Sequence, residues 1–216
     1  MNSKTKTLTL LAMLSAFAYI VMVVGRIPVV LFLKYDPKDV IITIGGFILG
    51  PLAAFIISLL VSIVEMFTVS DTGFIGLIMN IISTCSFACT AAFIYKHNKT
   101  LKGALIGLIS GGLLMTGVML LWNYIITPIY LGYPREAVAK MLVPAFLPFN
   151  LLKGSLNAAL TMLLYKPLVN SLRKSNLYTT TAQSGRKQKI NIGVMLTSFL
   201  VLITSILLVL VLNGTI

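Results

Sequence analysis

Residues 40–69 read VIITIGGFILGPLAAFIISLLVSIVEMFTV, an apolar stretch that is interrupted at Gly50-Pro51. Proline lacks a backbone N–H and clashes with the preceding helical turn, so the stretch predicts two helices that meet in a tight turn. The first, about 39–49, covers only about 16 Å, half of a hydrocarbon layer about 30 Å thick. Irregular backbone at membrane depth survives only where it is buried in protein or lines a cavity. We therefore predict that the preceding loop, residues 26–38, dips inward and roofs a cavity above this short helix.

The composition of the whole chain predicts an all-α integral membrane protein. Of its 216 residues, 58% are hydrophobic and 10% are charged, whereas a soluble domain carries about 25% charged residues. The net charge of +12 does not indicate nucleic-acid binding, because the cations lie in the gaps between apolar runs and form no basic patch with interleaved aromatics. That distribution is typical of signals that set membrane topology.

The apolar runs predict a six-helix bundle followed by a seventh, C-terminal transmembrane helix. The bundle fills residues 1–170, a polar basic linker spans 171–190, and the last helix lies within 191–216. The expected bundle helices are about 8–25, 39–49, 51–68, 74–95, 101–130 and 138–169. With the N-terminus in the cytoplasm, the inner segments hold more Lys and Arg than the outer ones, which favours this orientation. The seventh helix would then place the C-terminus outside.

The residues that enzymes and metal sites require do not occur in a suitable pattern. Cys85 and Cys89 lie inside an apolar run, where cysteine acts as a small apolar filler; we expect neither a disulfide nor a metal site. The chain has no G-x-x-x-x-G-K-[ST] loop to hydrolyse ATP, and its single histidine, His97, lies in a basic loop. We therefore predict that the chain is not an enzyme.

Ionisable groups inside a membrane are costly and usually face a cavity or a charged partner. Asn150, Lys153 and Asn157 fall at i, i+3 and i+7, so they share one helix face. The shared face could line a ligand cavity or could serve as a helix-packing network, as Asn157 alone could. For Lys153 a pure packing role is disfavoured, because an ammonium in lipid needs a strong partner. Glu65, near the outer end of its helix, could pair with Lys153, bind ligand, or be solvated at the interface.

Further amides and aromatics complete the predicted ligand site. Asn80 and Asn123 lie within apolar helices, and Trp122 stands beside Asn123. Trp122 and the nearby tyrosines could form an interfacial belt or could stack on a flat ligand. Tyr35, in the predicted roof loop, is added because of its position. Amides, an ammonium and aromatics suit a neutral, polar, planar molecule.

Ala12 and Ala16 are four residues apart on the first helix. Small residues at this spacing make a flat strip on which another helix can pack closely. The strip predicts either docking of a partner or packing inside the bundle.

The sequence resembles the riboflavin-specific S components of the energy-coupling factor (ECF) vitamin importers. The resemblance covers about residues 5–170. It rests on Lys34-Tyr-Asp-Pro-Lys-Asp39, Gly45-Gly-Phe-Ile-Leu-Gly-Pro51 with Glu65, Ser70-Asp-Thr-Gly73, Met79-Asn80 and Asn150-Leu-Leu-Lys-Gly154.

The resemblance implies a six-helix bundle in a bacterial cell membrane, with the loop after the first helix capping an outward-facing site. It implies capture of riboflavin, with FMN as a further candidate ligand, and no cofactor. Asn150 and Lys153 match the ligand-contacting Asn-x-x-Lys of the family. Ala12 and Ala16 would dock the transmembrane coupling subunit, and two separate ATPase subunits would hydrolyse ATP. The run 191–212 departs from the family plan.

Other functions stay open at this point. An S component could carry a different vitamin or base, such as thiamine or a queuosine precursor, although cationic thiamine suits a site beside Lys153 poorly. A stand-alone membrane transporter or a small membrane enzyme belongs to a different class, and uptake without ATPase partners would favour the transporter.

Overall fold

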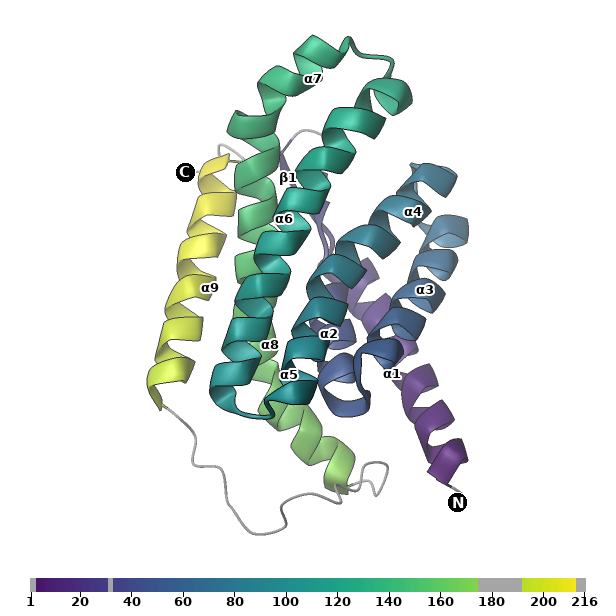
Figure 1. Cartoon of the computed structure of the whole chain (residues 1–216), viewed down its shortest axis with the longest axis vertical. Helices are drawn as coiled ribbons and strands as arrows, with labels where there is room; N and C mark the ends of the chain where they lie inside the picture. Colours follow the sequence, from purple (N-terminus) through teal and green to yellow (C-terminus); the bar gives the residue numbers. More distant parts are fainter. Residues whose placement is uncertain (1–2, 31–32, 175–191, 213–216) are drawn as a thin grey trace.

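The computed structural model describes residues 3–30, 33–174 and 192–212 of the chain (Figure 1). Within these residues, five helical stretches are long and apolar enough to cross a membrane. They are Lys4–Gly25, Pro51–Thr68, Gly73–His97, Leu101–Leu131 and Arg135–Ser171. With a short buried helix before residue 50 and a further helix at the C-terminal end, the predicted six-helix bundle plus one is confirmed.

The break at Gly50-Pro51 separates two helices as predicted. Helix α1 is Ser3–Gly25, α2 is Lys38–Leu49 and α3 is Pro51–Thr68. Gly50 has a φ of 102°, a conformation that only glycine adopts without strain, and Pro51 occupies the first turn of α3, where no N–H is needed. All residues of α2 from its first to Phe47 are buried, so this short helix lies inside the bundle rather than in contact with lipid.

The segment between α1 and α2 differs from the predicted loop. It contains an antiparallel hairpin of β1 (Ile27–Val30) and β2 (Leu33–Tyr35). In β2, Leu33 and Tyr35 are buried while Lys34 between them is exposed, because successive side chains of a strand point to opposite faces. The two strands of the hairpin thus hydrogen-bond each other's backbone N–H and C=O groups where the hairpin packs against the bundle. Strands this short gave no periodic signal in the sequence.

Two of the long spans contain a π-helical turn. Helices α4 (Gly73–Thr84) and α5 (Thr90–His97) are joined by η1 (Cys85–Cys89), and together they form the predicted helix 74–95. Both cysteines are free thiols in this turn, which packs against α3 and α6. Turns of this kind are often found at functional sites, and here the turn follows the end of α4 that lines the cavity described below.

The last two bundle helices carry most of the remaining site residues. Helix α6 is Leu101–Leu131 and ends at Gly132, whose φ is 68°. A short helix α7 (Arg135–Met141) and the turn η2 (Leu142–Phe146) lead into α8 (Leu147–Lys174). A Cβ built on Gly154 would lie 3.3 Å from the Cα of Gly112, so this glycine pair lets α8 approach α6 closely beside Lys153.

The apolar core lies where α1, α2, α3, η1, α5 and α6 meet. Its fully buried side chains include Leu10, Met22, Ile57, Phe87 and Met115. A smaller apolar cluster joins the hairpin to η2 and α8. The hairpin is therefore packed onto the helix that carries Lys153.

Helix α9 (Ile192–Leu212) is the predicted C-terminal helix and packs against α8. In Figure 1 it lies on the opposite flank of the bundle from α1. Of the predicted linker 171–190, residues 171–174 belong to α8, and residues 175–190 lie outside the described part of the chain.

Candidate ligand-binding site

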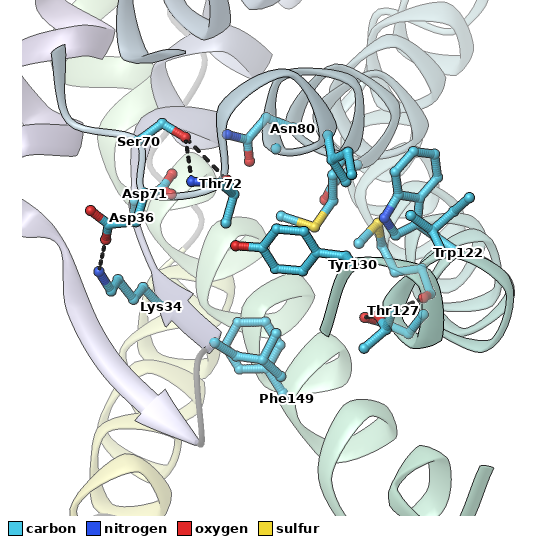
Figure 2. Close-up of a pocket in the computed structure, with 18 of the residues that line it drawn as sticks. Lys34, Asp36, Ser70, Asp71, Thr72, Asn80, Trp122, Thr127, Tyr130 and Phe149 are labelled. Atoms are coloured by element: carbon cyan, nitrogen blue, oxygen red, sulfur yellow. Dashed lines mark hydrogen bonds and ion pairs between the residues drawn. The ribbon is translucent and has the colours of Figure 1, made fainter. Parts of the chain in front are cut away.

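A cavity of about 270 Å³ lies between the hairpin, the turn after α3, and helices α4, α6 and α8 (Figure 2). Arg26, Leu33, Lys34 and Asp36, from the segment that was predicted to roof a cavity, line it, but no residue of α2 does. Most of the predicted site residues line the cavity. They are Glu65, Asn80, Trp122, Asn123, Asn150 and Lys153.

Tyr35 and Asn157, two of the candidate ligand residues, do not line the cavity. Both are buried behind its wall, where the Tyr35 hydroxyl donates a hydrogen bond of 3.0 Å to Asn157 Oδ1. Their side chains are occupied by protein partners because the hairpin folds down onto α8. This placement corrects the predicted ligand contact of Tyr35, and for Asn157 it matches the packing role that was left open.

Three cations and three carboxylates gather beneath the hairpin, so their formal charges cancel. They are Arg26, Lys38 and Lys153 with Asp36, Asp39 and Glu65. Buried charges are tolerated only when they are paired and hydrogen-bonded. Of this set, Arg26, Asp36, Glu65 and Lys153 line the cavity and make its floor and wall polar. Lys38 and Asp39 do not line it but pair with these residues.

Glu65 is the centre of the first half of this network. It accepts hydrogen bonds from Arg26 and Lys38, and from Asn80 Nδ2 at 2.9 Å. Only 3% of Glu65 is exposed, so the solvated position at the interface is wrong. Its ion-pair partners are Arg26 and Lys38, not Lys153.

Asp39 is the centre of the second half. Its Oδ2 lies 3.3 Å from Lys153 Nζ and accepts a hydrogen bond of 3.2 Å from Asn157 Nδ2. Its Oδ1 accepts a hydrogen bond of 2.6 Å from the Thr84 hydroxyl. The ammonium expected to need a strong partner therefore has one, supplied by the first turn of α2.

Two buried polar atoms at the cavity have no hydrogen-bond partner among the described residues. They are Asp36 Oδ1 and Arg26 Nε, and both residues line the cavity. A buried acceptor or donor without a partner costs free energy, so these atoms favour a ligand that carries complementary polar groups. Sequence reasoning did not select either residue, although both belong to the segment that was predicted to roof the cavity.

The amides on α6 and α8 are partly used by their own helices. Asn123 Nδ2 donates to the Met119 carbonyl oxygen at 2.7 Å, and Asn150 Nδ2 donates to that of Phe146 at 2.8 Å. These bonds fix both side chains in place. The amides therefore present a defined edge to the cavity instead of rotating freely.

Aromatic and thioether side chains form the opposite wall. Trp122, Tyr130 and Phe149 surround the same space in Figure 2. Tyr124 is exposed and carries the Arg135 guanidinium 5.6 Å from its ring centroid, outside the cavity. The aromatics of α6 thus divide between a ligand-facing wall and the outer surface. Tyr130 is one of the tyrosines for which belt and ligand stacking were both left open, and Phe149 is a cavity residue that sequence reasoning missed.

At the mouth of the cavity, the hairpin contacts the turn between α3 and α4. Lys34 Nζ lies 2.9 Å from Asp71 Oδ2. This hydrogen bond and the Lys34 charge lower the pKa of the Asp71 carboxyl. Because both groups are exposed, the pair contributes little to stability, but it joins the two segments that border the opening.

Comparison with known proteins agrees with this architecture. A family model described as ECF transporter, substrate-specific component matches residues 6–165. A relative named riboflavin transporter RibU from Staphylococcus aureus (strain TCH60) is 29% identical over 181 residues, which are 79% of this chain and 94% of that protein. A relative named riboflavin transporter FmnP from Bacillus subtilis (strain 168) is 27% identical over 191 residues, 81% of this chain and 100% of that protein.

A solved structure described as that of the S component of a bacterial ECF transporter superposes with a TM-score of 0.66 at 30% identity. The match covers 79% of this chain and 99% of the solved one. The family match ends before α9, which is thus an addition to the shared bundle. The chain is therefore a multi-pass membrane protein that belongs to the substrate-specific components of the ECF transporters.

Proposed function

We propose that this chain captures riboflavin from outside the cell and delivers it as the binding subunit of an ECF importer. The observation that carries the proposal is the cavity, in which an aromatic and thioether wall faces a charge-balanced polar floor. Riboflavin has matching chemistry, because its planar ring system is apolar at the dimethylbenzene end and polar at the imide edge. Relatives named riboflavin transporters support the same ligand.

The size of the cavity bears on how the ligand enters. Ligand pockets commonly hold about 300–1,000 Å³, and this cavity holds about 270 Å³. Riboflavin therefore needs the hairpin or the 70–72 turn to move outward, or its ribityl chain to extend into the mouth. FMN is a further candidate ligand, because the Lys34 ammonium stands near the opening, where a phosphate would lie.

Purified protein in detergent should quench the fluorescence of added riboflavin to a plateau at one ligand per chain. FMN and thiamine, added as competitors, define the ligand range. Competition by thiamine without binding of riboflavin would favour an S component for another vitamin. Uptake by vesicles that contain this chain alone would favour a self-sufficient transporter.

The orientation that suits this role has the N-terminus in the cytoplasm. Figure 1 draws the N-terminus at the opposite end of the bundle from the hairpin, so this orientation opens the cavity to the outside. The excess of Lys and Arg in the inner segments supports it. We expect the ATP to be hydrolysed by two separate ATPase subunits, since this chain has no phosphate-binding loop.

Ala12 and Ala16 remain the proposed docking strip for the coupling subunit. Both are exposed on the outer face of α1, and α9 packs on the other flank of the bundle, so it leaves the strip uncovered. The exposure of Ala12 and Ala16 disfavours the alternative, in which the strip serves packing inside the described bundle.

Ala12→Trp or Ala16→Trp should therefore prevent association with the coupling subunit and leave riboflavin binding unchanged. An indole on the strip holds the partner helix away, because small residues are what permit close approach. Co-purification of the coupling and ATPase subunits measures the effect. Leu121→Trp, at an exposed position of α6, is the matched control and should co-purify normally. Equal loss in the control, or loss of riboflavin binding in the α1 variants, would refute the assignment.

A further inference from the structure

A continuous chain of buried polar contacts connects the hairpin to the cavity ammonium. The Tyr35 hydroxyl of β2 donates to Asn157 Oδ1 at 3.0 Å, and Asn157 Nδ2 donates to Asp39 Oδ2 at 3.2 Å. The same Oδ2 lies 3.3 Å from Lys153 Nζ. Tyr35 and Lys153 are 6% and 7% exposed, and the two residues between them are fully buried. We call these four residues the relay.

The direction of each contact in the relay is fixed by its neighbours. If the Asn157 amide were turned over, its oxygen would face the Asp39 carboxylate and its N–H groups would face the Tyr35 hydroxyl. The carboxylate itself cannot rotate freely, because Thr84 holds its other oxygen at 2.6 Å. Polar groups buried in a low-dielectric interior are costly to leave unpaired, so moving one member displaces the next.

The two ends of the relay belong to parts of the site with different roles. Tyr35 and Asn157 do not line the cavity, and Asp39 does not line it either. Lys153 lines it, and so does Lys34, the neighbour of Tyr35 in β2. Thus the strand that borders the mouth and the ammonium that faces the cavity are joined through residues that do not line the cavity.

We infer that the relay couples the position of the hairpin to the orientation of the Lys153 ammonium. Asp39 and Asn157 are positioning residues that act through Lys153, and Tyr35 is the hairpin's attachment to them. The inference rests on the proposed function in so far as Lys153 contacts the ligand. Because coupling between two sites is reciprocal, a ligand that holds Lys153 also holds the hairpin over the cavity and slows its own escape.

Tyr35→Phe tests the ligand-bound side of this inference. The change removes one hydroxyl outside the cavity, and riboflavin should dissociate about three- to tenfold faster, as expected for the loss of one buried hydrogen bond. Stopped-flow recovery of flavin fluorescence measures the rate. Tyr19→Phe is the matched control, because the Tyr19 hydroxyl bonds Thr68 at 2.9 Å on the outer surface of the bundle, and its rate should not change. An unchanged rate in Tyr35→Phe would overturn the inference.

A double-mutant cycle in ligand-free protein tests the coupling without any assumption about the ligand. Hydrogen exchange of the hairpin amides, at residues 27, 29, 30 and 33–35, reports how often the hairpin opens. Tyr35→Phe should accelerate this exchange about three- to tenfold. Lys153→Met should accelerate it more, because it leaves the Asp39 carboxylate without its cation, and the double variant should exchange no faster than Lys153→Met alone. Tyr35 bonds Asn157 and Lys153 pairs with Asp39, with no hydrogen bond or ion pair between Tyr35 and Lys153 themselves in the described structure, so non-additivity measures transmission through Asn157 and Asp39.

If the two accelerations multiply in the double variant, the relay does not transmit and the inference fails. Should Lys153→Met not fold, Thr84→Val takes its place in the cycle, because it removes the other restraint on Asp39 at nearly constant volume. Non-additive exchange in a protein that does not bind riboflavin would sink the proposed function and leave the relay standing. Accelerations that multiply in a protein that binds riboflavin would refute the relay and leave the proposed function standing.

Discussion

Replacing Lys153 by methionine should raise the Kd for riboflavin by about 10- to 100-fold. A hydrogen bond to a charged group contributes about 1.5–3 kcal/mol, and about 1.4 kcal/mol corresponds to a factor of ten in affinity. Lys153 is the cation on α8 that lines the cavity and is 7% exposed. Equilibrium titration with riboflavin in detergent measures the change.

The single variant also leaves the Asp39 carboxylate buried without its cation, which by itself destabilises the bundle by about 3–5 kcal/mol. The double variant Asp39→Asn/Lys153→Met removes both charges and separates the two effects. It should recover most of the lost free energy of unfolding but none of the lost affinity. Recovery of wild-type affinity in the double variant would show that the ammonium does not contact the ligand.

Replacing Glu65 by glutamine should lower the free energy of unfolding by about 3–5 kcal/mol, the cost of leaving a buried ion without its partner. Glu65 holds both Arg26 and Lys38, and Lys38 is fully buried. The glutamine amide can keep the contact with Asn80 but cannot balance two cations. Denaturant titration in detergent micelles measures the loss.

Glu136→Gln is the matched control for this substitution. Glu136 is exposed in the first turn of α7, and exposed substitutions usually change stability by no more than about 0.5 kcal/mol. Equal stability of the Glu65 and Glu136 variants would mean that Glu65 is not the centre of a buried network.

The helical framework could be predicted because the hydrophobic runs and Gly50-Pro51 determine helix and helix break through residues that are neighbours in the sequence. A run of apolar residues sets a span, and glycine followed by proline sets the break between α2 and α3. The same argument predicted that residues 26–38 roof a cavity, and residues of this segment do line one, although α2 itself does not. The hairpin in that segment was missed, because strands of four and three residues are too short for alternation to be read.

The partners of the charged side chains could not be predicted in the same way. Lys153 was expected to need a strong partner, and Glu65 was the partner considered for it, whereas the structure pairs it with Asp39. Which carboxylate pairs with Lys153 depends on how α2 packs against α8. The hydrogen bond from Asn157 to Asp39, for example, joins residues that are 118 positions apart in the chain. Only the packing of the whole bundle brings them together.

Asn157 illustrates the limit of helix periodicity. It shares a face with Asn150 and Lys153, so spacing alone assigns it to the ligand site. The hairpin nevertheless covers the inner part of that face, and Tyr35 takes the Asn157 oxygen. The segment that lies over a polar helix face determines which of its residues can reach a ligand. The periodicity of that helix alone does not reveal where this segment lies.

The most direct test of the central claim, that riboflavin binds in this cavity, uses the single tryptophan of the chain. Trp122 lines the cavity, and flavins absorb where indole emits, so a flavin bound there must quench this emission. Titration with riboflavin should remove most of the tryptophan fluorescence and reach its plateau at one ligand per chain. Saturable binding of riboflavin that leaves the Trp122 emission intact would place the ligand elsewhere and contradict the account.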